Sequence, residues 1–232
     1  MAVLTKRLKK AHEVGNLTEA YTINDAVELL YKMPSVKFDE TVEVSASLGV
    51  DPKQSNQMVR GTVTLPNGSG KKVTVIVFTD NPQEALDAGA EHAGLEDLIA
   101  KIQGGWLEFD VAIATVSAMA KVKPIARVLG PRGLMPNPKS GTVTDDVATA
   151  IQAVKAGRVE FKMDKSANVA IVVGKRSFTP DALEANIKEA LKVLVGSKPE
   201  AFRGKFIHNV TISSTMSAGV KLLGSELAAF GA

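Results

Sequence analysis

Apolar and polar residues alternate along residues 37–50, KFDETVEVSASLGV. Apolar side chains occupy most even positions, whereas the odd positions are polar: Lys37, Asp39, Thr41, Glu43, Ser45 and Ser47. Because successive side chains of a strand point to opposite faces, this pattern predicts a half-buried β-strand. One face contacts a core, and the other presents hydroxyl groups and charges to water or to a partner.

A second alternating segment, residues 206–215, lies near the C-terminus as FIHNVTISST. Its even positions are largely apolar, and its odd positions carry Asn209, Thr211, Ser213 and Thr215. His208 falls in line with the apolar face, where we expect a hydrogen-bonded core histidine rather than a ligand or a base. If the two strands share a sheet, both ends of the chain build one domain and the middle is inserted.

The middle of the chain has a different pattern. Residues 73–78 form a continuous apolar run, which is typical of a strand covered on both faces, and residues 109–114 repeat it. Helical segments alternate with these strands at residues 82–90, 95–103, 118–129 (interrupted by Pro124) and 145–156 (with Thr144 available as its cap). This order favours parallel βαβ units, so residues 67–157 are predicted to form a Rossmann-like α/β insert.

The remaining segments, residues 1–66 and 158–232, are predicted to form the discontinuous terminal domain. Two further strands are expected at residues 159–163 and 169–173, the second more deeply buried. Asn24 is expected to cap a helix over residues 25–33, and Thr179 a helix that starts at Pro180. The predicted fold class is therefore a two-domain α+β and α/β protein, whose terminal domain has a four-stranded sheet with helices on one face.

Composition narrows the classes of partner. The 232 residues include 28 basic and 25 acidic side chains, a net charge of +3, which permits nucleic-acid binding without requiring it. The absence of cysteine excludes disulfides, thiol nucleophiles and cysteine-ligated zinc. No apolar run reaches membrane-spanning length, and the charged N-terminus does not resemble a signal peptide, so a soluble, cytoplasmic protein without a membrane partner is expected.

Catalytic patterns are weak. The three histidines are scattered, no HExxH or phosphate-binding loop occurs, and residues 69–72 fit S-x-x-K only as a turn. We therefore expect no enzyme, no cofactor and no metal site. The alternative is an enzyme that binds a nucleotide in the insert, which would show nucleotide affinity without RNA affinity.

Four stretches can contact a partner. The first is a basic N-terminal segment with Lys6, Arg7, Lys9 and Lys10, which is either a solvated helix face, the slightly favoured interpretation, or a phosphate-contacting arm. The loop at residues 130–139 is rich in glycine and proline, and it is either a rigid connector or a phosphate contact through Arg132 and Lys139. Residues 37–43 combine a cation, an aromatic ring and acceptors, and residues 213–219 combine small polar side chains around Met216. The alternative interpretation of each stretch is an ordinary strand end without a partner.

Several motifs in this chain resemble those of the bacterial type of the large-subunit ribosomal protein L-one family. They are KFDETVEV with LGVDP, NQMVRGTVTLPNGSGK, LGPRGLMPNPKSGTV and a late STM, in the family's order and spacing over essentially the whole length. The resemblance implies a discontinuous terminal domain with a Rossmann-like insert. It also implies a non-enzymatic constituent of the large ribosomal subunit in the cytoplasm, placed in the mobile stalk near the tRNA exit site.

The same resemblance implies partners and contact residues. The terminal domain is expected to bind large-subunit ribosomal RNA, to assist release of deacylated tRNA from the exit site, and to repress translation by binding its own operon's messenger RNA leader. The free protein is expected to be a monomer. The expected RNA contacts are Lys37, Phe38, Thr41, Glu43, Ser213, Thr215, Met216, Ser217 and Gly219, with Arg132 and Lys139 as a secondary RNA or interdomain contact. Ser217 stands where the family usually has glycine, so its Cβ is expected to crowd the RNA backbone, and Gly219 partly restores the pattern.

Overall fold

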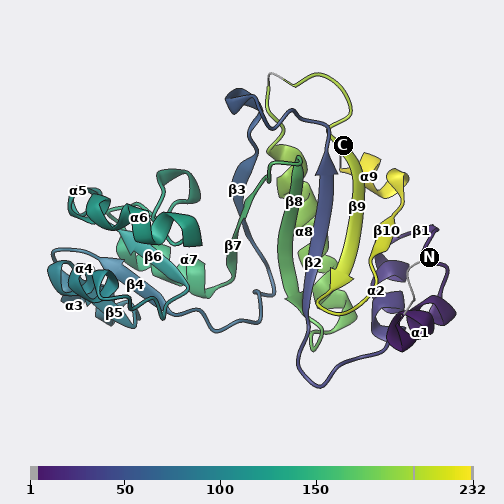
Figure 1. Cartoon of the computed structure of the whole chain (residues 1–232), viewed down its shortest axis with the longest axis horizontal. Coiled ribbons are helices and arrows are strands. Elements are labelled where there is room, and N and C mark those ends of the chain that lie inside the picture. Colours follow the sequence, from purple (N-terminus) through teal and green to yellow (C-terminus); the bar gives the residue numbers. More distant parts are fainter. Residues whose placement is uncertain (1–4, 201, 231–232) are drawn as a thin grey trace. The chain divides into compact units, whose positions relative to one another are not determined.

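The computed structural model describes residues 5–200 and 202–230, and the chain divides into two compact units (Figure 1). Unit 1 combines Met1–Gly70 with Val159–Ala232, and unit 2 is the intervening Lys71–Arg158. The boundary between the first segment of unit 1 and unit 2 follows Gly70, whereas the sequence placed it after residue 66. Gly70 packs against unit 1, since a Cβ at this position would lie 2.8 Å from Lys175 Cγ and 2.9 Å from the Phe178 ring.

Unit 1 is built on a five-stranded sheet in which the two ends of the chain meet. Its strands, in spatial order, are β1 (Ala20–Tyr21), β10 (Val220–Leu222), β9 (Ile207–Ser214), β2 (Thr41–Leu48) and β8 (Asn168–Lys175). β1 runs parallel to β10, and the other neighbours are antiparallel. The expected pairing of the first and last alternating segments is thus observed in the β2–β9 ladder.

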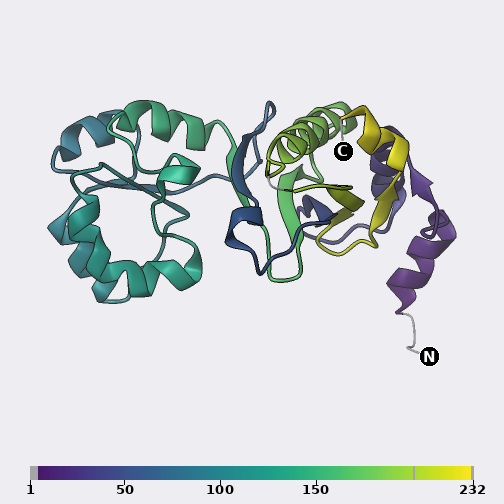
Figure 2. The ribbon, with the colours of Figure 1, turned by 90° about the horizontal axis from the view of Figure 1, so that it is seen from above.

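Helices cover one face of this sheet, as Figures 1 and 2 show for α8. The helices of unit 1 are α1 (Lys6–Val14), α2 (Ile23–Lys32), α8 (Pro180–Gly196) and α9 (Gly224–Ala229), with a short 3₁₀ turn η1 (Ser55–Gln57). The buried residues of α2 and α8 share one core with the even positions of β2: Val42, Val44, Ala46 and Leu48. The odd positions of β2 therefore face away from the helices.

The predicted four-stranded sheet is wrong in membership and in number. The expected strand at residues 159–163 is β7 (Arg158–Lys162), and it pairs with β3 (Arg60–Thr64) in a separate two-stranded sheet. An ion pair between Arg60 and Glu160 joins these two strands. The main sheet instead gains the short strands β1 and β10, which have too few residues to show an alternating pattern.

Local signals explain where the helices of unit 1 begin. Thr179 accepts a hydrogen bond from the Ala182 amide and Pro180 occupies the first turn of α8, as predicted. For α2 the predicted cap was wrong. Thr22, not Asn24, accepts the capping bond, from the Asp25 amide, and the helix begins at Ile23. The apolar Ile23 is buried, so the first turn lies on the core rather than in the preceding loop.

Two strand predictions in unit 1 need correction. β8 is half-buried rather than deeply buried, because Asn168 and Ala170 on its outer side are exposed. His208 is also exposed rather than a core histidine. The β2–β9 register shifts there, with Ser47 opposite Asn209 and Leu48 opposite Ile207, so a bulge displaces the histidine from the apolar face.

Unit 2 is a parallel α/β unit with helices on both faces of its sheet. Its strands are β5 (His92–Gly94), β4 (Val75–Phe78) and β6 (Val111–Ala114), in that spatial order. Both neighbours of β4 run parallel to it, as the alternation of buried strands and helices predicts. The three-residue β5 was not predicted, since its sequence HAG carries no apolar run.

The helices of unit 2 bury opposite sides of β4. They are α3 (Pro82–Asp87), α4 (Glu96–Gln103), α5 (Met119–Val122), α6 (Ala126–Leu129) and α7 (Val147–Lys155), with 3₁₀ turns η2 (Lys123–Ile125), η3 (Gly130–Arg132) and η4 (Pro138–Ser140). Ile76 and Phe78 join one core with α4, α5 and α6, whereas Val75 and Val77 join another with α3 and α7. Asp146 rather than Thr144 caps α7, by accepting from the Thr149 amide.

Candidate nucleic-acid interface

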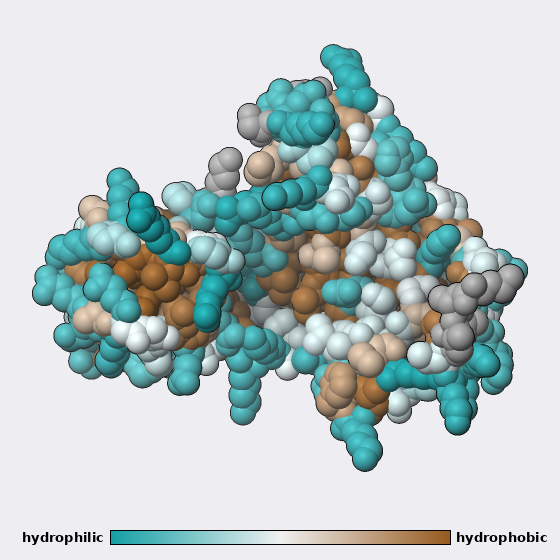
Figure 3. All heavy atoms as spheres, viewed as in Figure 1, coloured by the Kyte–Doolittle hydropathy of each residue, from teal (hydrophilic) through white to brown (hydrophobic). Residues whose placement is uncertain are grey.

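The uncovered side of the main sheet carries two adjacent rows of polar side chains, here called the polar face. Its members are Thr41, Glu43, Ser45 and Ser47 on β2 and Asn209, Thr211, Ser213 and Thr215 on and just after β9. The antiparallel register places Glu43 opposite Ser213, Ser45 opposite Thr211 and Ser47 opposite Asn209. Figure 3 shows this side as a pale, weakly polar surface over β2 and β9.

The middle of the polar face is available to a partner. Within residues 5–200 and 202–230, the side chains of Ser45, Ser47, Asn209 and Thr211 have no hydrogen-bond partner. A surface with unused hydroxyl and amide groups can donate to and accept from a polar ligand without first breaking bonds inside the protein. The alternation of polar and apolar residues predicts that these side chains point outward, but they were not among the predicted contact residues.

At the end of the polar face formed by Thr41 and Thr215, the polar groups are hydrogen-bonded to one another. The Thr215 hydroxyl accepts from the Thr41 amide at 3.0 Å, and the Thr215 amide donates to the Thr41 carbonyl at 3.0 Å. The Thr41 hydroxyl in turn accepts from Lys175 Nζ at 2.8 Å. Thr41 and Thr215, both predicted RNA contacts, are therefore hydrogen-bonded to each other, and these bonds hold the chain after β9 against the start of β2.

Glu40, directly before β2, is a buried carboxylate that was not among the predicted contact residues. Its side chain is 1% exposed and accepts from the Ser214 hydroxyl, from the Met216 amide at 3.3 Å and from Arg176 Nη1 at 3.1 Å, with Arg7 Nη2 at 3.5 Å. Burial by itself raises the pKa of Glu40, but these hydrogen bonds and the two guanidinium charges outweigh it, so the pKa lies below its ordinary value. The carboxylate stays ionised and joins four separate segments of unit 1.

The chain turns sharply after β9, and we call residues 214–219 the β9 turn. The Ser217 hydroxyl accepts from the Ser214 amide at 2.8 Å and donates to the Ala218 carbonyl at 2.9 Å. The hydroxyl of Ser217, a predicted RNA contact, is thus hydrogen-bonded within the turn. Gly219 approaches β9 so closely that a Cβ would lie 2.7 Å from Thr211 Cγ2, which explains a glycine at this position.

Two large apolar side chains stand exposed beside this end of the polar face. Phe38 is 55% exposed and Met216 is 51% exposed. Phe38 and the neighbouring Lys37 lie in a bend before β2 rather than inside the strand, so the predicted start of the strand at residue 37 is wrong. Both apolar side chains are close in sequence to the contact between Glu40 and the Met216 amide. They offer flat or flexible apolar surface next to hydrogen-bonding groups.

The structure brings most of the expected contact residues together in unit 1. Thr41, Glu43, Ser213, Thr215, Met216, Ser217 and Gly219 surround the end of the β2–β9 ladder, with Lys37 and Phe38 in the segment that leads into it. Arg132 is in unit 2, exposed at the end of η3, before Gly133 with its positive φ of 72°. Lys139 lies within η4, and its side chain is outside the described part of the chain.

In the described residues, no group of three or more histidine, aspartate or glutamate side chains is arranged to hold a metal ion. None of the described helices is long and apolar enough to cross a membrane.

Comparison with known proteins gives a consistent result. The family model described as "Ribosomal protein L1p/L10e family" matches residues 30–218. The large ribosomal subunit protein uL1 of Kosmotoga olearia is 49% identical over 220 residues, which cover 94% of this chain and 95% of that protein. The protein of the same name from Protochlamydia amoebophila is 48% identical over 229 residues, and the coverage is 97% of each chain.

A third relative extends the agreement. The large ribosomal subunit protein uL1 of Saccharopolyspora erythraea is 50% identical over 222 residues, covering 95% of this chain and 93% of that protein. The resemblance first noted from the motifs is thereby confirmed. These relatives are named as ribosomal proteins rather than enzymes, which agrees with the expectation that this chain is not an enzyme.

Proposed function

This chain belongs to the ribosomal protein L1p/L10e family, and from that premise we propose that unit 1 binds large-subunit ribosomal RNA through its polar face and the β9 turn. The observation that carries the proposal is the pair of adjacent polar rows on β2 and β9, with unused side-chain groups in the middle and two exposed apolar side chains at one end. In this proposal the protein is a structural constituent of the large ribosomal subunit in the cytoplasm.

The chemistry of the surface suits a folded RNA better than a long duplex DNA. Hydroxyl and amide groups can bond to 2′-hydroxyls and base edges, while an exposed aromatic or methionine side chain can lie against an unstacked base. The charges around the polar face are mixed: Lys175 donates to Thr41 and Arg176 pairs with the buried Glu40, while Glu43 is an acidic member of the face. Shape and hydrogen bonding therefore carry a large part of the recognition in this proposal, rather than net positive charge alone.

Further parts of the proposal rest on the resemblance. They are the assisted release of deacylated tRNA from the exit site, the repression of the protein's own operon through its messenger RNA leader, and the monomeric state of the free protein. The exposed Arg132 of unit 2 supplies a cation for a secondary RNA contact. The Rossmann-like description of unit 2 belongs to the same proposal, supported by its parallel sheet and two helix layers.

Methionine truncation tests the placement of the RNA surface. Met216→Ala should weaken binding to large-subunit ribosomal RNA by about fivefold or more, because covering the exposed methionine side chain with a base buries apolar surface worth about 1 kcal/mol or more. Met58→Ala is a matched control, since Met58 is also a methionine of unit 1, is also 51% exposed, and lies outside the polar face. Filter binding at one salt concentration measures both. Equal affinities of the two variants would remove the β9 turn from the interface.

A further inference from the structure

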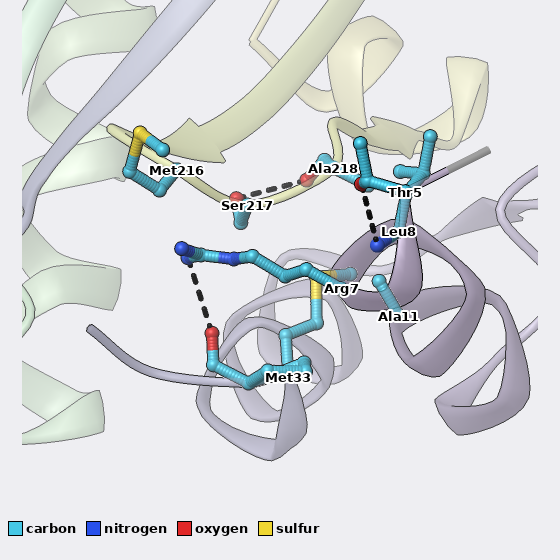
Figure 4. A pocket seen from close by; sticks show the side chains of 9 residues that line it. Thr5, Arg7, Leu8, Ala11, Met33, Met216, Ser217 and Ala218 are labelled. Carbon is cyan, nitrogen blue, oxygen red and sulfur yellow. Dashed lines mark hydrogen bonds between the residues drawn. The ribbon is translucent and has the colours of Figure 1, made fainter. Parts of the chain in front are cut away.

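A pocket of about 190 Å³ opens beside the polar face, between α1, the end of α2 and the β9 turn (Figure 4). Leu8 and Ala11 of α1 and Met33 after α2 form apolar parts of its wall. Met216 and Ser217 of the β9 turn line it from the other side. Because Met216 belongs both to this wall and to the proposed RNA surface, the pocket is continuous with that surface.

Arg7 supplies the charged group of the pocket. Its side chain extends from α1 toward the β9 turn, between Ser217 and Met33, as Figure 4 shows. Its Nη2 atom contacts the Pro34 carbonyl at 3.3 Å and Glu40 Oε1 at 3.5 Å. For the part of the chain described, Nε and Nη1 of Arg7 have no hydrogen-bond partner. The guanidinium is thus fixed in place at one nitrogen and retains donors for a ligand.

The surrounding charges favour an anionic group close to the pocket. Arg7 and Arg176 share a single carboxylate, that of Glu40, so this triad retains one positive charge. The exposed face of α1 adds Lys6, Lys9 and Lys10. The volume argues for a small group, because pockets for drug-sized ligands measure about 300–1,000 Å³.

We infer that this pocket receives one unstacked base of the RNA that the polar face binds, an inference that rests on the proposed function. Proteins that recognise folded RNA commonly take such bases out of the helix and place them against arginine planes and apolar side chains. Here the base lies against the Arg7 guanidinium and the wall formed by Leu8 and Met33, and its phosphate lies toward the basic face of α1. The N-terminal helix is thereby part of the RNA site.

The test uses the shortest transcribed fragment of large-subunit ribosomal RNA that the unaltered protein binds. Ala218→Leu adds carbon atoms to the pocket wall, and Arg7→Met removes the guanidinium while keeping an unbranched side chain. Each should weaken binding by about tenfold. Ala228→Leu on α9 and Lys192→Met on α8 make the same kinds of change at exposed positions outside the pocket, and each should change affinity by less than about twofold.

Chemical probing of RNA 2′-hydroxyl reactivity adds a readout that a change in protein stability does not produce. One nucleotide protected by the unaltered protein should become reactive with Ala218→Leu, while the rest of the footprint persists. An unchanged footprint and affinity with Ala218→Leu would overturn the inference. Ala218→Leu leaves the Arg7–Glu40 pair in place, so it decides the question even if Arg7→Met fails to fold.

The two proposals fail in distinguishable ways. If the unaltered protein binds no fragment of large-subunit ribosomal RNA, the proposed function fails and the pocket inference falls with it. If Met216→Ala weakens binding but Ala218→Leu and Arg7→Met match their controls, the RNA surface stands and the pocket inference alone is refuted.

Discussion

Replacing Glu40 by glutamine should destabilise unit 1 more than any similar change on the polar face. The substitution keeps the size of the side chain but removes the one negative charge that Arg7 and Arg176 share. It also places an amide NH₂ group where the carboxylate accepts from the Ser214 hydroxyl and the Met216 amide. Buried donors then face each other or remain without an acceptor.

The contacts set the size of the effect. Removing one partner of a buried ion pair commonly costs about 3–5 kcal/mol of unfolding free energy. Arg176 is 11% exposed and cannot recover much hydration, whereas Arg7 is 28% exposed and can recover part of it. Glutamine also retains one acceptor oxygen. We therefore expect a loss near the lower end of that range, about 3 kcal/mol.

The effect should depend on pH in a defined direction. The pKa of Glu40 in the folded protein lies below its ordinary value of 4.5, so the unfolded chain binds a proton more readily than the folded one. The stability that the carboxylate contributes is then fully present above that ordinary value and is lost as the pH falls through the lower folded pKa. The difference between the unaltered protein and Glu40→Gln should be largest near neutral pH and shrink below about pH 4.5.

Urea unfolding followed by far-ultraviolet circular dichroism measures this difference. Trp106, the chain's one tryptophan, lies in unit 2, so its fluorescence follows the unit that the substitution leaves untouched. Glu43→Gln is the matched control, because Glu43 is a half-buried carboxylate three residues later, on β2, and it should change stability by less than about 0.5 kcal/mol. Equal stability of Glu40→Gln and Glu43→Gln across the pH range would refute the reasoning.

Two further predictions concern the β9 turn. Thr215→Val removes the acceptor for the Thr41 amide, so the protein should lose about 1 kcal/mol of stability while its fold stays intact. Filter binding at fixed salt should also show weaker ribosomal RNA binding. Unchanged affinity would exclude this hydroxyl from the proposed RNA site. Gly219→Ala places a Cβ 2.7 Å from Thr211 Cγ2 and should lower the unfolding free energy by about 1–3 kcal/mol in thermal melts. Thr211→Ser, which removes that methyl group, should restore most of the loss in the double variant, and a failure to do so would place the strain elsewhere.

The polar face could be predicted from sequence because its signal is local. Burial in β2 follows the two-residue period of a strand, so the parity of each position determines the face to which its side chain points. The start of α8 was predictable for a similar reason, since Thr179 and Pro180 act within a single turn. In both cases, a few neighbouring residues contain the whole physical cause.

The features that were missed depend on distant partners. Glu40 is tolerable in the core because distant groups bind its carboxylate, among them Arg176, which is 136 residues away in sequence. An acidic residue at an even position of the first alternating segment was the available signal, but nothing nearby identified its partners. The bulge at His208 has the same origin, because a shift of register against β2 leaves no trace in the composition of β9.

The discontinuity of unit 1 also sets an order of events during synthesis. Glu43 and Ser213 are neighbours across the β2–β9 ladder although 170 residues separate them, whereas unit 2 is one continuous segment. Chains emerge from their N-terminus, so unit 2 has all its residues available while β2 still lacks a neighbour. The nascent chain must keep an alternating, half-apolar strand unpaired over that interval. The polar face can assemble only when β9 has been made, so an incomplete chain lacks the surface that we propose to bind RNA.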